Sequence, residues 1–221
     1  MTISVVIPTL GEQETIEAAI ASARGALDPW QVIVADGGST DRTRELAEAA
    51  GAVVVDAPGT RAEALNAGAR LATGDALLFL HADTTLPAGA GAAVRSTLAR
   101  ADGGAFSVRF DERPRIARLA AACYERLHRG VYGDQAIFVT RAAFDRVGGY
   151  RPLPIMEDFD FVQRLRWAGR FVVLPDTVTT SARRQQAHGE VRTFLTVASI
   201  KLLYRLGVSP ARLARLYRRL S

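Results

Sequence analysis

Short, uninterrupted apolar runs separated by helical patterns constrain the fold of this chain more than any other feature. The four runs lie within residues 3–83 and read ISVVIP, WQVIVAD, AVVVDA and DALLFLHAD. They lack the polar–apolar alternation of a half-exposed strand, so we expect strands buried on both faces, which are typical of parallel sheets covered by helices. The sequence therefore predicts an α/β fold, with a mostly parallel central sheet flanked by helices.

The second half of the chain has a different pattern. The run GGAFSVRF (103–110) alternates apolar and polar residues, as an antiparallel or edge strand does, and a helix is expected over 114–130. This predicts a smaller antiparallel portion beside the parallel sheet. Residues 191–221 read as a helical tail, broken near 207–210 by a Gly-Val-Ser-Pro sequence. We expect one domain over 1–190 and a basic helical extension over 191–221.

Charge is unevenly distributed along the 221 residues. Residues 181–221 hold nine Lys and Arg against one Glu, a balance of +8, which leaves 19 basic against 22 acidic residues (−3) in the rest of the chain. The basic character therefore belongs to the tail and does not indicate nucleic acid as a partner. A single cysteine excludes a disulfide framework, and no signal peptide or spanning segment is evident. These features predict a cytoplasmic protein.

Polar residues follow three of the expected strands. They are the segments 8–12 (PTLGE), 36–41 (DGGSTD) and 81–83 (HAD). In an open parallel sheet the carboxyl ends of the strands share one edge, where ligands bind. Taken alone, DGGSTD reads as a turn in which Ser39 or Thr40 caps the next helix, and this is compatible with Asp36 pointing into a cleft.

The segment LLFLHADTT leaves two alternatives open. His81 and Asp83 could form a metal and phosphate site, or merely the polar rim of a core strand. Common alternatives are unsupported, since the chain has no G-x-G-x-x-G after the first strand, no phosphate-loop motif, no H-E-x-x-H and no G-x-S-x-G.

An acidic cluster opens the expected helix in PIMEDFDF (154–161). Glu157, Asp158 and Asp160 suit a helix N-terminus, where the dipole favours acids. Their neighbours Met156 and Phe159 are unusually apolar for a solvated cap. A carboxylate that is partly desolvated there would have a raised pKa and could act as a general base.

Five segments together resemble family 2 glycosyltransferases of the GT-A fold. They are VVIPTLGEQETI, VIVADGGSTDRT, LNAGARLATGDALLFLHADT, GDQAIFVTRAAFDRVGGY and MEDFDFVQRLRWAGR, in order along residues 1–185. Within the family the chain looks most similar to a short bacterial branch that often accompanies radical-SAM genes. The resemblance implies a nucleotide-binding half (1–100) and an acceptor and catalytic half (101–190).

The resemblance also implies a reaction. It is the metal-dependent, inverting transfer of a sugar from a nucleotide sugar, typically linked to uridine diphosphate (UDP), to a hydroxyl acceptor. Asp83 matches the last acid of the family's Asp-x-Asp motif, which holds Mg²⁺ or Mn²⁺ on the diphosphate, and Asp158, next to Glu157, matches the catalytic base. The implied nucleotide-binding residues are Pro8, Thr9, Glu12, Asp36, Arg61, His81 and Arg184, with Asp36 on the nucleobase.

This chain departs from the family pattern at two places. The first acid of Asp-x-Asp is His81, for which a role beside the metal is favoured over that of a ligand. The C-terminal Gln-x-x-Arg-Trp of processive members is absent, since Gln185 follows Arg183-Arg184, and this favours a non-processive enzyme. Arg183 or Arg184 could still hold the diphosphate. His188 could complete the metal shell, with a histidine in a surface loop as the alternative.

Two questions stay open at this point. The leucine- and arginine-rich tail (191–221) would pack on the domain or on a second copy in a homodimer, or it would bind an anionic membrane surface peripherally, at the inner membrane face. The alternative functions are a nucleotidyltransferase of related fold and a degenerate nucleotide-binding module. The acidic PTLGEQET disfavours the former, which would show a glycine-rich basic loop there.

Overall fold

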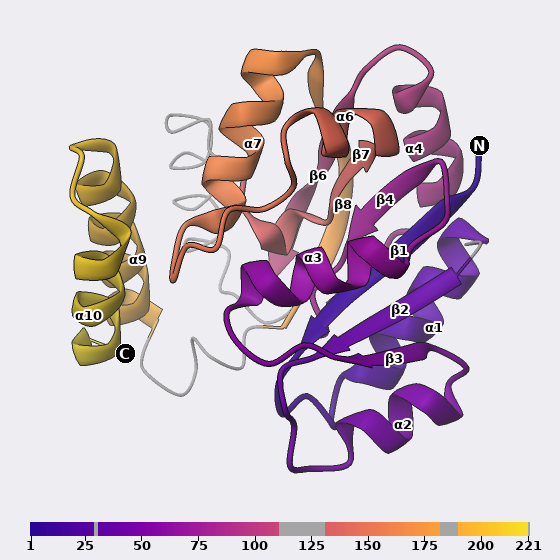
Figure 1. The fold of residues 1–221 in the computed structure, drawn as a ribbon, viewed down its shortest axis with the longest axis horizontal. Coiled ribbons are helices and arrows are strands. Elements are labelled where there is room, and N and C mark those ends of the chain that lie inside the picture. The colour runs from indigo at the N-terminus through magenta and orange to yellow at the C-terminus, as the bar shows by residue number, and fades with distance from the viewer. Residues whose placement is uncertain (29–30, 111–130, 182–189, 221) are drawn as a thin grey trace.

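The structure of the protein is a computed structural model, which describes residues 1–28, 31–110, 131–181 and 190–220 (Figure 1). The expected helix over 114–130 and the residues Arg183, Arg184, Gln185 and His188 lie outside these ranges.

A single sheet of eight strands, in the order β3-β2-β1-β4-β7-β6-β8-β5, organises the described residues. Strands β1 to β4 pair in parallel, whereas β7 runs antiparallel to both β4 and β6. This confirms the predicted parallel sheet with a smaller antiparallel portion. The strands are β1 (Ile3–Thr9), β2 (Gln31–Asp36), β3 (Val53–Asp56), β4 (Ala76–Phe79), β5 (Thr84–Thr85), β6 (Gly103–Phe110), β7 (Ile137–Thr140) and β8 (Phe171–Thr180).

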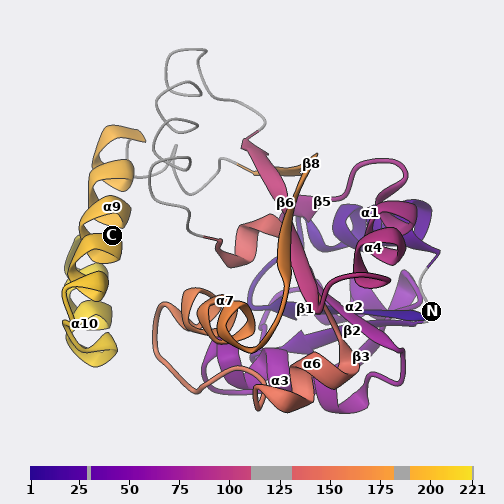
Figure 2. The same ribbon diagram turned by 90° about the horizontal axis from the view of Figure 1, so that it is seen from above.

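Helices cover both faces of the sheet (Figure 2). Side chains of α1, α2 and α4 belong to one core cluster, and side chains of α3, α6 and α7 belong to another. The helices are α1 (Ile16–Leu27), α2 (Thr43–Ala49), α3 (Arg61–Leu71), α4 (Ala90–Leu98), α6 (Arg141–Arg146) and α7 (Glu157–Ala168), and a short 3₁₀ helix, η1 (Gly133–Gln135), precedes β7.

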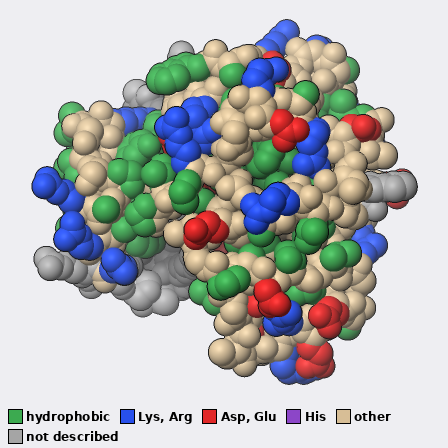
Figure 3. Space-filling view, viewed as in Figure 1, with side chains coloured by type: hydrophobic (Ala, Val, Ile, Leu, Met, Phe, Trp, Pro, Cys, Tyr) green, Lys and Arg blue, Asp and Glu red, His purple; other side chains and the backbone are tan. Residues whose placement is uncertain are grey.

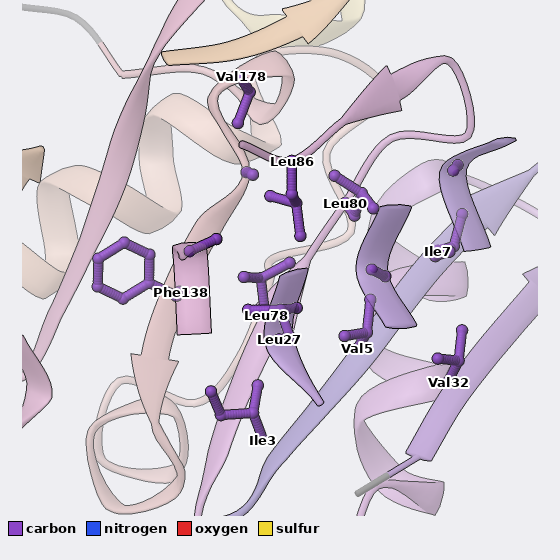
Figure 4. Close-up of a cluster of buried hydrophobic side chains, with 14 of the residues drawn as sticks. Ile3, Val5, Ile7, Leu27, Val32, Leu78, Leu80, Leu86, Phe138 and Val178 are labelled. Carbon is purple, nitrogen blue, oxygen red and sulfur yellow. The ribbon is translucent and has the colours of Figure 1, made fainter. Parts of the chain in front are cut away.

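The apolar runs are uninterrupted because each strand contributes to both cores. Val5 and Ile7 point into the cluster shown in Figure 4, while Val6, between them, joins the opposite cluster. The opposite cluster is partly aromatic. Tyr150 stacks on Phe161 of α7 with ring centroids 4.1 Å apart. This packing fixes α7, which begins with the acidic residues Glu157 and Asp158.

The tail forms two helices, α9 (Glu190–Arg205) and α10 (Pro210–Leu220), which pack on each other. The break falls where the Gly-Val-Ser-Pro sequence predicts it, and Gly207 has a φ of +86°. Leu213 is fully buried, whereas Leu202 and Leu206 are 57% and 71% exposed. An apolar area over this hairpin is bordered by basic side chains (Figure 3). None of the helices in the described ranges is long and apolar enough to cross a membrane.

Two helical glycines give a matched test of the close packing of α3 on the sheet. A Cβ at Gly68 would lie 2.4 Å from Cγ1 of the fully buried Val6. We expect Gly68→Ala to lower the free energy of unfolding by about 1–3 kcal/mol through overpacking, as measured by urea unfolding.

The control is Gly25→Ala in α1, where a Cβ would meet nothing within 4 Å. It should raise the free energy of unfolding by about 0.5–1 kcal/mol, because alanine favours helix more than glycine. A Gly68→Ala protein as stable as the unmodified chain would contradict this account of the packing.

Candidate active site

A pocket opens where β1, β2 and β4 end. Six of the residues predicted to bind nucleotide or metal line it, namely Pro8, Thr9, Glu12, Arg61, His81 and Asp83. Leu10, Gly37, Ala57, Gly59, Thr60, Ala64 and Ala82 complete the lining. The strand ends thus converge at one edge of the sheet, as the parallel arrangement predicts.

Asp36 lies beneath this pocket and is 1% exposed. Its Oδ2 accepts hydrogen bonds from the backbone N–H groups of Gly38 (3.1 Å) and Ser39 (2.9 Å), and Arg44 adds an ion pair at 3.3 Å. Burial alone would raise the pKa of Asp36, but the hydrogen bonds from Ser39 and Gly38 lower it below its usual range. Asp36 therefore holds the turn that contributes Gly37 to the pocket wall.

The predicted helix cap after this turn is wrong. Neither Ser39 nor Thr40 caps α2, because the helix begins only at Thr43. The N-cap is Arg42, whose side chain makes no capping hydrogen bond, and Asp41 before it accepts from the Thr43 backbone N–H through Oδ1 at 3.0 Å. The Ser39 hydroxyl oxygen accepts from the Gly11 backbone N–H at 2.9 Å, which ties the turn to the segment after β1.

Arg61 joins the pocket to the acidic start of α7. Its Nε donates to Glu157 Oε1 at 2.6 Å, and its terminal nitrogen pairs with Asp158 Oδ2. The Arg61 side chain is 38% exposed, whereas the two carboxylates are only 7% and 8% exposed. A capping box between Thr60 and Glu63 fixes the first turn of α3 and thereby the origin of the Arg61 side chain. The T-x-x-E spacing of Thr60 and Glu63 predicts this capping box from the sequence alone.

His81 completes this network, and its partner defines its protonation state. Its Nε2 lies 2.6 Å from the Arg61 guanidinium. A guanidinium can only donate, so Nε2 must accept, and the imidazole is neutral with its proton on Nδ1. In this arrangement neither ring nitrogen offers a lone pair to a metal ion.

Asp158 is a carboxylate with a strongly raised pKa. Burial raises its pKa to about 6, with contributions from the negative charges of Glu157 and Asp134. The Arg61 charge and a hydrogen bond from the Gly133 backbone N–H oppose this rise. A carboxyl group with such a pKa can take up a proton near neutral pH. The apolar neighbours of Asp158 in the sequence predict this desolvation.

Gly133 and Asp134 of η1 complete the group of residues around Arg61, His81 and Asp158. A Cβ at Gly133 would lie 2.5 Å from His81 Nε2 and 2.6 Å from Asp158 Oδ2, so a side chain there would displace one of them. Burial raises the pKa of Asp134; the charges of Lys201 and Arg61 oppose this rise, and the charge of Asp83 adds to it. Both residues lie in the segment GDQAIFVTR, in which no local motif predicts a role for them.

Asp83 is a carboxylate in the pocket lining that could hold a divalent cation. Its Oδ1 lies within 3.3 Å of the Thr84 hydroxyl and 3.4 Å of the Thr180 hydroxyl. Within the described ranges, no three His, Cys, Asp or Glu residues gather so that they could hold a metal ion. Mg²⁺ and Mn²⁺ fit such a site, because hard cations often take one or two carboxylates, substrate phosphates and water.

The Arg61 network predicts how Asp158 titrates. In Arg61→Met we expect the pKa of Asp158 to rise above about 6, because the main opposing positive charge is removed while burial remains. Carboxyl ¹³C chemical shifts followed against pH measure this value.

Arg44→Met is the matched control, since Arg44 pairs with Asp36 and Asp56 instead. It should leave the titration of Asp158 unchanged. An Asp158 that still titrates near pH 6 in Arg61→Met would show that the ion pair does not influence it.

Curated relatives match part of the chain. Two proteins named undecaprenyl-phosphate 4-deoxy-4-formamido-L-arabinose transferase, from Pectobacterium carotovorum and Pectobacterium atrosepticum, are each 37% identical over 97 residues. Each match covers 38% of this chain and 30% of the relative, so the chain spans about a third of the length of these proteins.

Solved structures share the fold over most of the chain. A mannosyltransferase from Pyrobaculum calidifontis, PcManGT, in complex with GDP-Man and Mn²⁺, has a TM-score of 0.70 at 21% identity, covering 99% of this chain and 69% of that one. TarS from S. aureus in complex with UDP has a TM-score of 0.67 at 17% identity, covering 89% and 65%. Glucosyl-3-phosphoglycerate synthase from Mycobacterium tuberculosis, with Mn²⁺, UDP and glucosyl-3-phosphoglycerate, has a TM-score of 0.56 at 22% identity, covering 94% and 80%.

The family itself follows from the sequence profile of "Glycosyl transferase family 2", which matches residues 4–120, more than half of the chain. Together with the sheet order and the structural neighbours, this match shows that the chain belongs to glycosyl transferase family 2 and has the GT-A fold.

Proposed function

We propose that this protein is a metal-dependent, inverting and non-processive glycosyltransferase that moves a sugar from a UDP-linked donor to a hydroxyl acceptor. The observation that carries the proposal is the pairing of two carboxylates with different environments. Asp83 lies at the pocket edge, and Asp158, with its pKa raised to about 6, is linked to the same pocket through Arg61. The first suits cation binding and the second suits proton transfer.

The donor assignment has two supports. Five residues that the family resemblance assigns to the nucleotide line the pocket, and structural neighbours are named as complexes with UDP or with GDP-Man and Mn²⁺. In the proposal, Pro8, Thr9 and Glu12 contact the nucleoside. Asp36 acts on the nucleobase side by holding the Gly37 turn. Arg61, His81 and Arg184 act on the diphosphate.

The chemistry follows from the positions of the two carboxylates. The acceptor hydroxyl oxygen attacks the anomeric carbon, and Asp158 takes the hydroxyl proton. The bond from the anomeric carbon to the diphosphate oxygen breaks, and UDP leaves with the electron pair. A divalent cation at Asp83 would supply positive charge to the leaving diphosphate when bound. Attack opposite the leaving group inverts the configuration at the anomeric carbon.

Donor binding should depend on both metal and Asp83. We expect UDP to raise the melting temperature of the protein more with Mn²⁺ than without it, because binding to the native state stabilises it. In Asp83→Asn the metal-dependent part of this shift should disappear, as measured by thermal unfolding.

Asp176→Asn, at an exposed position of β8, is the control and should respond like the unmodified protein. If no nucleoside diphosphate shifts the melting temperature with either Mg²⁺ or Mn²⁺, the donor assignment is wrong.

Asp158 should govern the acidic limb of the pH–rate profile. A base works only when deprotonated, so kcat/KM should rise with pH through an apparent pKa of about 6 and then level off. Asp158→Asn should lower kcat by about 10²- to 10⁴-fold while UDP binding is kept. UDP release from a panel of nucleotide sugars and acceptors measures both effects.

Asp160→Asn provides the comparison within the same helix turn, since Asp160 pairs with Arg151 and Arg164 outside the pocket. It should keep kcat within a few-fold of the unmodified value. An active Asp158→Asn enzyme with an unchanged pH profile would exclude this base.

We further propose that residues 191–221 contact an anionic membrane surface, at the inner membrane face. Leu202 and Leu206 are exposed near arginines, among them Arg205 and Arg212, and this combination suits acidic lipid headgroups. The double variant with Leu202→Glu and Leu206→Glu should lose co-sedimentation with phosphatidylglycerol vesicles. Unchanged vesicle binding would exclude this membrane contact. A dimer of the unmodified protein that the same variant dissociates would identify the homodimer as the correct alternative.

A further inference from the structure

The first tail helix, α9, contacts residues that adjoin the proposed base, Asp158. The Lys201 ammonium of α9 lies 3.5 Å from the centroid of the Tyr132 ring, within the range of a cation–π contact. Tyr132 in turn stacks on Phe159, with centroids 5.9 Å apart. Tyr132 immediately precedes Gly133, and Phe159 immediately follows Asp158. Through these two stacked rings, Lys201 therefore packs against the two segments that adjoin the proposed base, Asp158.

A second contact keeps α9 in this position. The Tyr204 ring meets the Phe159 ring edge-on, with centroids 5.7 Å apart, and the Arg205 guanidinium lies 5.6 Å from the same ring. Aromatic contacts of this kind are directional, so they orient the helix as well as bury area. The position of Lys201 is thus set by at least two contacts on neighbouring turns of α9.

The charge of Lys201 also acts within the site. After burial, it has the largest influence on the pKa of Asp134, and Arg61 and Asp83 act on that same carboxylate. The ammonium consequently belongs to the same group of charges as the proposed donor and metal residues, although it comes from the tail.

Lys201 and Tyr132 border the base from outside the donor pocket. The described residues that line the pocket come from segments 8–12, 37, 57–64 and 81–83, and none of them comes from η1, α7 or α9. An acceptor hydroxyl must reach Asp158 while the donor fills its own pocket. The surface made by Tyr132 and Lys201 is where the rest of that acceptor would lie.

We propose that Lys201 and the Tyr132 ring form an acceptor subsite that binds a phosphate group of the acceptor. The ring holds the ammonium in place, and the ammonium is a point charge of the kind that binds phosphate. Binding the phosphate there would hold a neighbouring hydroxyl of the acceptor at Asp158. This proposal rests on the proposed function. A soluble phosphorylated alcohol and a lipid phosphate share the required chemistry.

Isothermal titration calorimetry on the full chain, saturated with UDP and Mn²⁺, tests the subsite. The probes are glycerol 3-phosphate and a short-chain lysophosphatidic acid, which each carry a hydroxyl beside the phosphate, and each is compared with its uncharged alcohol. We expect both phosphates to bind more tightly than the alcohols, and the tighter of the two identifies the source. Lys201→Met should weaken phosphate binding at least 10-fold with the Kd for UDP unchanged, and Lys201→Arg should restore it to within a few-fold.

Arg100→Met, at an exposed position after α4, is the matched control and should bind the phosphates normally. Equal thermal unfolding of Lys201→Met and the unmodified chain separates a binding role from a structural one. The subsite alone is overturned if the unmodified protein binds UDP but neither phosphate. It is also overturned if Lys201→Met binds the phosphates as tightly as the unmodified protein does. Absence of UDP binding by the unmodified protein overturns the proposed function and the subsite together.

Discussion

The ion pairs of Arg61 with Glu157 and Asp158 join the two halves of the chain, and the rest of the site depends on them. Two adjacent carboxylates that are less than a tenth exposed repel each other and lose hydration. The N-terminus of α7 compensates part of this, and the Arg61 guanidinium compensates more. The same guanidinium sets the tautomer of His81. The Arg61 side chain thus connects the pocket, His81 (at the position of the first acid of Asp-x-Asp) and the proposed base, Asp158.

The antiparallel strand β7 makes this meeting possible. Phe79 at the end of β4 pairs with Ile137 at the start of β7, because the two strands run in opposite directions. The segment before β7 therefore arrives beside the segment after β4. This places Gly133 so close to His81 and Asp158 that a side chain at position 133 would displace one of them. A parallel strand in this position would have brought its other end there.

Burial explains why the chemistry divides between the acids. Asp36 is buried as well, yet hydrogen bonds from Ser39 and Gly38 keep its pKa low, and it serves the turn. Asp158 is buried with fewer compensating donors and with another acid beside it, so its pKa rises. Similar burial therefore gives a structural carboxylate in one place and a candidate base in the other.

Local sequence patterns predict the α/β sheet, the shared edge of its strand ends and the desolvation of the acids at the start of α7. These patterns are the uninterrupted apolar runs, the polar residues directly after them, and the apolar neighbours of Asp158. The pairing of Arg61 with residues 96 and 97 positions away is visible only in the folded chain, as are the place of Asp134 beside them and the contact of Lys201 with Tyr132. Such contacts depend on strand order and helix packing between distant segments, and no local period or spacing encodes them.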